Sequence, residues 1–337
     1  MKTVLVVGGA GYIGSHAVAA LMTADHRVIV LDDLSSGHRD LVLGGKLIVG
    51  SCGDPQLLER IFASNEIDAV MHFAASSIVH DSVTQPLAYY RNNVANTLEL
   101  LDAMRRYRVS NFIFSSSAAV YGEPSELPIP ETHPLLATNP YGATKRVIEE
   151  MLPACAISHG LRFAVLRYFN AAGADPDGRI GERHEPETHL IPLVLQVAAG
   201  TRANIKILGA DYATQDGTCV RDYVHVIDLV QAHLLALERL FRGEALNAIY
   251  NLGNRRGYSV REVIAAARRI SGHPIPAIEA PRRTGDPAIL VAESNKAKTE
   301  LGWQPQFEDI EAIIGSAWSW HKREAARTTA IAPHTMT

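Results

Sequence analysis

Cysteine is scarce in this chain. Among 337 residues only Cys52, Cys155 and Cys219 occur, and they lie far apart. Three scattered thiols cannot supply the disulfide framework of a small secreted protein or the paired cysteine motifs of a zinc site. The sequence therefore predicts a protein of a reducing compartment, and we expect the cytoplasm.

Long apolar runs are also missing. The N-terminal run at residues 4–7 is broken by Gly8 and Gly9, whereas the apolar core of a signal peptide needs about 7 to 15 residues. No later stretch approaches the roughly 18 apolar residues of a membrane-spanning helix. We expect neither export nor a membrane partner.

No tract of a single charge sign stands out. The chain has 32 Lys and Arg against 36 Asp and Glu, a net charge of −4, and no long basic run. A broad basic surface for nucleic acid is therefore not expected. A small anionic ligand is compatible with this charge, because a few well-placed arginines can hold it.

What the sequence does contain is a regular alternation of short apolar runs and amphipathic stretches. Hydrophobic residues make up 47% of the chain, and the length suits roughly two domains of about 150 residues. Strand-like runs lie at 4–7, 28–31, 47–49, 69–73 and 112–114, and helical stretches separate them. This order predicts an α/β fold, a Rossmann doubly wound parallel sheet with helices on both faces.

The pattern changes after a further strand-like run at 162–168. Residues 171–189 are rich in Gly, Pro, Asp, Glu and His and lack apolar periodicity, which predicts a functional loop. Shorter elements follow at 190–199, 205–208, 226–241, 249–252, 260–270 and 309–324. We expect a first domain over 1–170 and a smaller mixed α/β domain over 171–326 at its carboxyl edge. Part of the late chain is expected to return to the first domain, and 327–337 to form a loose tail.

A glycine motif follows the first predicted strand. Residues 8–14 read Gly-Gly-Ala-Gly-Tyr-Ile-Gly, and Gly8, Gly11 and Gly14 would let the backbone approach a pyrophosphate at a helix N-terminus. Asp32 ends the next predicted strand. An acid there accepts hydrogen bonds from ribose hydroxyls and repels a 2′-phosphate, so the motif predicts NAD rather than NADP as the cofactor.

A second motif carries acid/base chemistry. Tyr141 and Lys145 lie four residues apart at the start of a predicted helix, so their side chains share one face. A cation beside a phenol lowers the phenol pKa, which would make Tyr141 a general acid and base. The preceding strand ends in Ser115-Ser116-Ser117, at the sheet edge where open α/β folds bind ligands. The residues predict an NAD-dependent redox enzyme; a serine-rich turn beside a surface tyrosine is the alternative.

Together these motifs resemble the extended short-chain dehydrogenase/reductase family. The glycine motif, FSSSAAVYG with Ser117, YGATK with Tyr141 and Lys145, and RYFN at 167–170 carry a similarity that extends from residue 2 to about 324. Within that family the chain is most similar to the UDP-hexose 4-epimerases. Family dehydratases have Thr-Asp-Glu where this chain has Ser117-Ala118-Ala119, so elimination is not expected.

The resemblance implies NAD-dependent 4-epimerisation of UDP-glucose and UDP-galactose through a transient 4-ketose. Tyr141 would move the proton of the sugar 4-hydroxyl, Ser117 would hydrogen-bond the reacting oxygen, and Lys145 would hold the nicotinamide ribose. The resemblance also implies a homodimer, formed through helices at about 86–107 and 142–158.

Two sets of ligand-binding residues follow from the same resemblance. The implied cofactor set comprises Gly8, Gly11, Tyr12, Ile13, Gly14, Asp32, Asp33, Ser36, Gly37, Ser51, Cys52, Phe73, Ala74, Ala75, Ser77, Asn93, Ser115, Tyr141, Lys145 and Phe169. The implied UDP-sugar set comprises Ser117, Tyr141, Asn170, His189, Leu190, Ile207, Leu208, Arg221, Tyr223, Arg283, Asp286 and Leu290.

Two positions depart from the family pattern. Relatives place an aspartate after the third strand to bind the adenine amino group, whereas this chain has Ser51 there, with Asp54 as the alternative. Leu290 matches a position where a tyrosine restricts some relatives to plain hexoses. A leucine leaves room for N-acetylated substrates such as UDP-GlcNAc and UDP-GalNAc.

Other readings stay open. A related epimerase acting on UDP-glucuronate or UDP-xylose is one, and a non-catalytic NAD-binding sensor is another, although the intact Ser117, Tyr141 and Lys145 count against a sensor. His184 and His189 stand five residues apart without a third ligand in view, so we expect no metal site.

Overall fold

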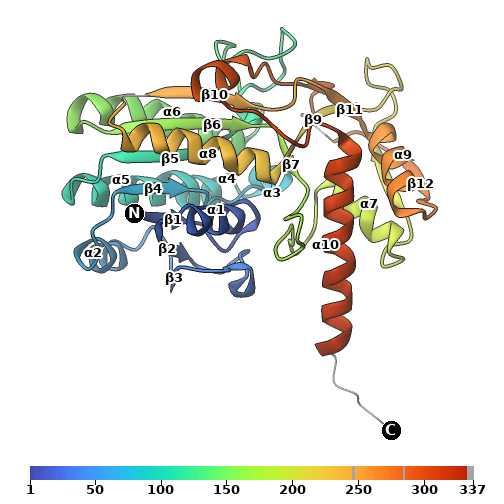
Figure 1. The fold of residues 1–337 in the computed structure, drawn as a ribbon. Helices are drawn as coiled ribbons and strands as arrows, with labels where there is room; N and C mark the ends of the chain where they lie inside the picture. Colours follow the sequence, from blue (N-terminus) through green and yellow to red (C-terminus); the bar gives the residue numbers. More distant parts are fainter. Residues whose placement is uncertain (245–246, 284, 332–337) are drawn as a thin grey trace.

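The computed structural model describes residues 1–244, 247–283 and 285–331, and a seven-stranded parallel sheet forms the larger part of it (Figure 1). The strand order is β10-β6-β5-β4-β1-β2-β3. The strands are β1 (Thr3–Val7), β2 (Arg27–Asp32), β3 (Lys46–Val49), β4 (Ala69–His72), β5 (Asn111–Ser117), β6 (Arg162–Tyr168) and β10 (Ala248–Leu252). The predicted doubly wound parallel sheet is confirmed.

Strand β1 shows why its sequence is apolar without interruption. Val4 and Val6 face one side, where they join α1 (Tyr12–Thr23) and α8 (Val226–Phe241) in a core. Leu5 and Val7 face the other side, in a core with α2 (Pro55–Ala63), α5 (Asn96–Arg106) and α6 (Pro140–His159). Because successive strand side chains point to opposite faces, a sheet covered on both sides buries every residue of β1.

Two elements of the second half of the chain pack with this first sheet. β10 pairs with β6 in parallel, from Ala248 opposite Ala164 to Leu252 opposite Tyr168. Helix α8 covers β5 and β6 beside α1. The carboxyl ends of β1, β4, β5 and β6 therefore meet at one edge, next to segments from both halves. The domain division at residue 170 itself stays a prediction.

The remaining elements form a smaller group beside that edge (Figure 1). A four-stranded sheet contains β7 (Asn170–Ala172), β9 (Val220–His225), β11 (Gly257–Ser259) and β13 (Ile289–Leu290), and β8 (Ile205–Leu208) pairs with β12 (Ala277–Ala280). Helices α7 (Leu190–Ala198), α9 (Val260–Ser271) and α10 (Ile310–Ile331) share one apolar core. Between β7 and α7 the chain has no regular element, as predicted for 171–189 apart from the short strand at its start.

Two expected helices differ from their predicted bounds. The segment at 86–107 consists of α4 (Pro86–Tyr89), a π-helical turn (Tyr90–Ala95) and α5, preceded by α3 (Val79–Thr84). Helix α10 continues to Ile331, seven residues past its predicted end, so the expected loose tail is wrong for 327–331. The rest of that tail, 332–337, lies outside the described residues.

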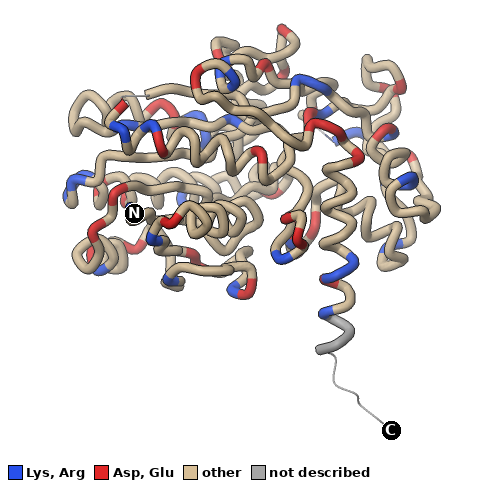
Figure 2. Tube along the Cα trace, in the orientation of Figure 1, with Lys and Arg blue, Asp and Glu red and all other residues tan. Residues whose placement is uncertain are grey.

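Charged side chains of both signs are interspersed over both parts of the molecule (Figure 2). This agrees with the balanced composition. Within the described ranges, no helix combines the length and the apolarity that crossing a bilayer requires.

Candidate functional site

The glycine motif forms a tight turn between β1 and α1. Gly8 has a φ of +83°, and a Cβ there would lie 2.4 Å from the backbone nitrogen of Ala74; a Cβ on Gly14 would lie 2.1 Å from the Gly8 carbonyl oxygen. Around Gly11 the described chain leaves more room, since a Cβ would approach only the Gly8 oxygen, at 3.5 Å. The fold itself thus requires Gly8 and Gly14, whereas Gly11 keeps space open at the helix start.

The start of α1 suits an anion. Gly11 is its N-cap, and among the described residues no side chain caps it and no acid lies in its first turn. The first amides and the helix dipole therefore remain available to a diphosphate. Tyr12 and Ile13 follow directly, and the Tyr12 hydroxyl donates to the Gly173 carbonyl at 2.6 Å, which joins the turn to the segment after β7.

Asp32 closes the same region from the end of β2. Its carboxylate accepts from the backbone nitrogens of Ala10, at 2.8 Å, and Leu34, at 2.9 Å. Burial raises the pKa of Asp32, and these two hydrogen bonds lower it in part. Asp33, Ser36 and Gly37 follow in the adjoining turn, where the Asp33 carboxylate is exposed.

The two candidates for the adenine position both accept backbone hydrogen bonds. Asp54 is the N-cap of α2, and its Oδ1 accepts from the backbone nitrogens of Gln56 and Leu57, at 2.9 and 3.1 Å. The Ser51 hydroxyl accepts from the Gly53 amide at 3.1 Å. The adenine amino group needs an acceptor, and a carboxylate and a hydroxyl each have more than one lone pair, so the choice between Ser51 and Asp54 stays a prediction. Cys52 is buried, and this burial raises its pKa to about 12.

Asn93 forms hydrogen bonds with the turn that follows β4. Phe73, Ala74, Ala75 and Ser77 lie in this turn, at the carboxyl edge of the sheet. The buried Asn93 side chain accepts from the Ser76 amide at 2.8 Å and donates to the Ser76 carbonyl and to Thr144 Oγ1, both at 3.0 Å. These bonds occupy the Asn93 amide, so Asn93 positions the turn.

The three predicted catalytic residues come together at the carboxyl end of β5. The Ser117 side chain lies close enough to Tyr141 to lower the pKa of the Tyr141 phenol. Lys145 is buried one helical turn after Tyr141; its Nζ donates to the Ser115 carbonyl at 2.8 Å and lies 6.0 Å from the centroid of the Tyr141 ring. Asn139 caps α6 by accepting from Gly142, and this fixes where Tyr141 enters the site.

Lys145 was predicted to lower the pKa of Tyr141, and for the protein without bound ligands this prediction is wrong. Burial raises the pKa of Tyr141, and the Ser117 side chain lowers it only in part. The reason is that the Lys145 ammonium is directed to the Ser115 carbonyl. Burial also lowers the pKa of Lys145 to about 7, while Glu149 opposes this effect.

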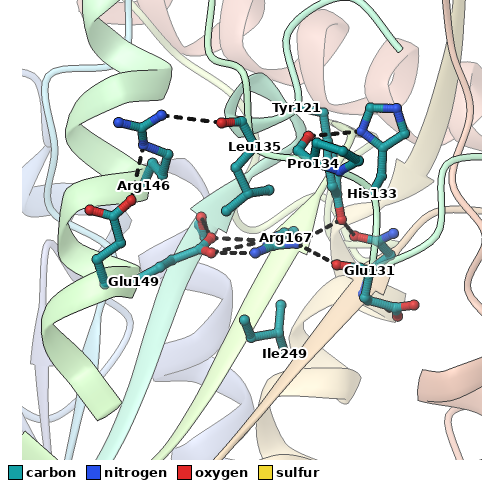
Figure 3. Close-up of polar contacts among 12 residues, drawn as sticks. Tyr121, Glu131, His133, Pro134, Leu135, Arg146, Glu149, Arg167 and Ile249 are labelled. Carbon is teal, nitrogen blue, oxygen red and sulfur yellow. Dashed lines mark hydrogen bonds and ion pairs between the residues drawn. The ribbon is translucent and has the colours of Figure 1, made fainter. Parts of the chain in front are cut away.

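A buried ion pair that the sequence analysis missed joins Arg167 to Glu149 (Figure 3), whose carboxylate acts on the charge of Lys145. Arg167 of β6 donates from Nε to Glu149 Oε1 at 3.0 Å and from Nη2 to Glu149 Oε2 at 2.5 Å. On its other side Arg167 donates to the Tyr121 hydroxyl, and Ser116 Oγ donates to Glu149 at 2.5 Å. The spacing Tyr141, Lys145, Glu149 places all three on one helix face and is the signal that could have revealed Glu149.

The predicted substrate residues gather on the smaller sheet. Asn170 lies opposite Tyr223 in the β7–β9 pairing, and Leu290 lies opposite Arg221 in the β13–β9 pairing. Arg221 forms an ion pair with Asp286 and donates to the Pro287 carbonyl at 2.8 Å. Four of these predicted residues thus share neighbouring strands. Arg283, which was assigned to the diphosphate, is exposed.

Five more residues of the predicted cofactor and substrate sets lie on other elements of the fold. Ile207 is buried in the core formed with β8, whereas Leu208 points the other way and is half-buried. Their assignment to the uracil stays a prediction. Phe169 is buried after β6. His189 is the N-cap residue of α7 and Leu190 its first residue.

His184 and His189 do have further ligands beside them. Glu182, His184, Glu187 and His189 offer ligand atoms that all lie within 4.8 Å of one another. The expectation of no metal site rested on a missing third ligand, and that premise is wrong. Burial lowers the pKa of both histidines, but the two carboxylates outweigh it and raise the pKa of His184 to about 9 and that of His189 to about 10.

Comparisons with known proteins identify the group to which the chain is similar. The model of the NAD dependent epimerase/dehydratase family matches residues 4–253. The UDP-glucose 4-epimerase of Halalkalibacterium halodurans is 53% identical over 95% of this chain and 95% of its own length.

Two solved structures share the fold. The UDP-glucose 4-epimerase of Brucella ovis in complex with NAD has a TM-score of 0.91, with 46% identity over 95% of this chain and 98% of that one. The enzyme of Bifidobacterium longum in complex with NAD+ and UDP has a TM-score of 0.92, with 39% identity over 96% and 99%. The chain belongs to the NAD dependent epimerase/dehydratase family.

Proposed function

We propose that the protein is an NAD-dependent UDP-hexose 4-epimerase that interconverts UDP-glucose and UDP-galactose through a transient 4-ketose. The observation that carries this proposal is the convergence of Ser117 at the end of β5 with Tyr141 and Lys145 at the start of α6, at the same sheet edge as the glycine turn. The relatives named above are UDP-glucose 4-epimerases, two of them solved with NAD.

Tyr141 acts as the general acid and base for the sugar 4-hydroxyl, and Ser117 holds the reacting oxygen by a hydrogen bond. The redox chemistry would be supplied by NAD, which would take up the C4 hydride and give it back to the opposite face of the ketose. The residues that fit this cofactor are the Gly8–Gly14 turn, the open start of α1 and Asp32, whose carboxylate disfavours a 2′-phosphate.

The charge of Lys145 changes close to neutral pH. Its pKa near 7 lets it gain or lose a proton close to neutrality, and a negatively charged neighbour would stabilise the ammonium form. We assign it to the nicotinamide ribose.

The UDP-sugar lies on the β7–β9–β13 side. Arg221 offers a planar fork to the diphosphate, and Asp286, now its ion-pair partner, would turn to the uridine ribose. Asn170, Tyr223 and Leu208 complete this wall, with the exposed Arg283 as a second cation for the diphosphate.

The test is incubation of the purified protein with UDP-galactose without added NAD, with product followed by chromatography. The wild type should form UDP-glucose with no net NADH. Tyr141→Phe should retain bound NAD but lose about 10² to 10⁴ in kcat. Tyr107→Phe, a change to a surface tyrosine hydrogen-bonded to Glu59, is the matched control and should keep full activity.

The alternatives predict different results in the same assay. A uronate or pentose epimerase would convert UDP-glucuronate or UDP-xylose but not UDP-galactose. A sensor would bind NAD and convert none of them.

Substrate range depends on Leu290 in this proposal. The smaller side chain admits an N-acetyl group, so UDP-GlcNAc and UDP-GalNAc should also be interconverted. Leu290→Tyr should suppress the N-acetylated pair while the plain hexoses still turn over. A wild type without activity on UDP-GlcNAc would contradict this assignment.

The homodimer is part of the proposal as well. Val83, Leu87 and Leu98 expose apolar side chains on α3, α4 and α5, and Ile157 of α6 is 90% exposed. Exposed apolar residues on adjoining helices suit a subunit contact. Light scattering should give twice the mass of one chain, and Leu87→Glu should reduce it. The cytoplasmic location stays a prediction.

A further inference from the structure

Two histidines and two glutamates converge in the segment between β7 and α7, and of these four only His189 belongs to the predicted UDP-sugar set. His189 Nδ1 lies 2.8 Å from Glu182 Oε1 and 3.2 Å from Glu187 Oε1. His184 Nδ1 lies 3.3 Å from Glu182 Oε1 and 3.6 Å from Glu187 Oε2. We call these four residues the His–Glu cluster.

In the His–Glu cluster two carboxylate side chains lie close together and are almost completely buried. The side chains of Glu182 and Glu187 are each 7% exposed, and both face the same two imidazoles. Two carboxylates at such a site need positive charge between them, because a buried unpaired charge is costly. The four donors come from eight consecutive residues, so one short segment encloses the point where they meet.

The distances match the edges of a small coordination polyhedron. In a tetrahedral site with metal–ligand bonds of about 2.0–2.2 Å, neighbouring ligand atoms are roughly 3.3–3.6 Å apart. Three of the four imidazole–carboxylate distances, 3.2, 3.3 and 3.6 Å, lie in or next to that range.

The direction of one ring nitrogen gives an independent indication. His184 Nδ1 is buried and has no hydrogen-bond partner within the described part of the chain, although two carboxylate oxygens lie within 3.6 Å. The ring is therefore close to the carboxylates without being aligned to donate to them. On losing its proton, His184 Nδ1 would present a lone pair to an ion held between these oxygens, as a metal ligand does.

We propose that the His–Glu cluster binds one zinc-class divalent metal ion. Two imidazole nitrogens and two carboxylate oxygens suit Zn²⁺, whereas Mg²⁺ and Ca²⁺ prefer oxygen ligands alone. All four positions are filled by protein side chains, which is typical of structural rather than catalytic zinc.

The surroundings indicate what the ion stabilises. The His184 ring lies edge-on to the Tyr12 ring, with centroids 6.3 Å apart, and Tyr12 opens the helix proposed to receive the NAD diphosphate. The neighbouring Arg183 pairs with Asp40 and with Glu324 of α10. The metal fixes the segment 173–189 between α1 and α10. The benefit to NAD retention rests on the proposed function, whereas metal binding does not.

The experiment uses the full chain after treatment with a chelator. Wild type is titrated with ZnCl₂ and, separately, with CoCl₂; bound metal is measured by mass spectrometry and Co²⁺ geometry by visible absorption. We expect one Zn²⁺ per chain, intense tetrahedral Co²⁺ bands and displacement of Co²⁺ by Zn²⁺ but not by Mg²⁺. Substoichiometric zinc, or the weak bands of octahedral Co²⁺, would overturn the proposal.

Variants locate the site. Because changes even to outer-shell partners cost about 10- to 100-fold in metal affinity, His184→Gln and Glu187→Gln should each weaken Zn²⁺ binding at least about 100-fold. His159→Gln, an exposed histidine at the end of α6, is the matched control and should bind zinc as wild type does. Equal affinity in the cluster variants and the control would refute the site. If a variant fails to fold, the wild-type cobalt spectrum still decides.

Two further measurements separate this inference from the proposed function. Tyr141→Phe should bind Zn²⁺ like wild type, whatever its activity. Zinc should also slow tryptic cleavage after Arg179 and Arg183, which lie in the fixed segment. Unchanged cleavage in zinc-loaded protein would refute the fixing role.

Discussion

Two groups of charged side chains lie near predicted site residues, one beside Lys145 and one beside Tyr12, and they are built differently. The Arg167–Glu149 pair joins a strand to a helix, with side chains only 2% and 3% exposed; Ser116 also donates to Glu149, and Arg167 also donates to the Tyr121 hydroxyl. The His–Glu cluster lies in one irregular segment, and the His189 side chain is half exposed.

The difference lies in which group carries the positive charge. Burial lowers the pKa of Arg167, but the Glu149 hydrogen bonds outweigh it and raise the pKa above its usual value, so the guanidinium stays charged at every physiological pH. In the cluster the positive charge belongs to imidazoles, which can exchange their protons for a metal. The first group therefore fixes the fold behind the catalytic residues, and the second can change state.

Breaking the Arg167–Glu149 pair should have the largest effect on stability. Glu149→Gln leaves a buried guanidinium without its counter-charge, which should lower the free energy of unfolding by about 3–5 kcal/mol. Urea denaturation at pH 7 measures this loss.

Glu150→Gln is the matched control. Glu150 is the next residue on α6, and its side chain is 60% exposed in a surface pair with Arg146. We expect a change within about 0.5 kcal/mol. Similar losses in both variants would show that the buried pair has no special role.

The first half of the molecule was predictable because its signals are local. The β-branched run of β1, the glycine turn and Asp32 lie within 32 residues, and each has its own structural requirement: burial on both faces, close backbone approach, an acid at a strand end. The helix 226–241 was also predicted with its observed bounds, because its apolar period is strong.

What sequence reasoning missed depends on contacts distant in the chain. Arg167 contacts Glu149 only because β6 packs beside α6. In the same way, β10 joins the first sheet and α8 covers it because of packing between distant segments, which the periodicity of the sequence does not show. Glu182 and Glu187 were not singled out within the predicted functional loop, since only the fold of the segment turns them toward the histidines.

Removing one carboxylate from the cluster should have a smaller effect. In buffer with chelator, Glu182→Gln takes one charged partner from His184 and His189, which should cost about 1–2 kcal/mol because the His189 side chain is half exposed. Urea denaturation of Glu182→Gln, His189→Gln and the double variant forms a cycle.

The cycle tests whether the residues act as a unit. The double variant should lose at least about 0.5 kcal/mol less than the sum of the single losses. Additive losses would mean that the cluster is four independent side chains, and the comparison with the Arg167–Glu149 pair would fail.

The buried His72 of the sheet and the histidines of the His–Glu cluster should have opposite effects on how stability depends on pH. Burial lowers the pKa of His72, at the end of β4, to about 3, whereas an unfolded histidine has a pKa of about 6.5. Between these values the unfolded chain binds more protons, so the free energy of unfolding falls as the pH drops from about 6.5 toward 3. His184 and His189 act oppositely: their pKa values are raised, so the stability they add is complete below about 6.5 and is lost as the pH rises through 9 to 10.

His72→Gln tests the prediction for the buried histidine of the sheet. The quantity compared is the change in the free energy of unfolding between two pH values, not the free energy at one pH. The substitution removes one titrating group, so between pH 7 and pH 5 the variant should lose less stability than wild type, by at most about 2 kcal/mol. His159→Gln, with an exposed ring, should keep the wild-type pH dependence. Thermal or urea unfolding at both pH values gives the comparison. If His72→Gln followed the wild-type curve, His72 would be free to take up a proton in the folded protein, and the sheet would not exclude charge from this position as its burial requires.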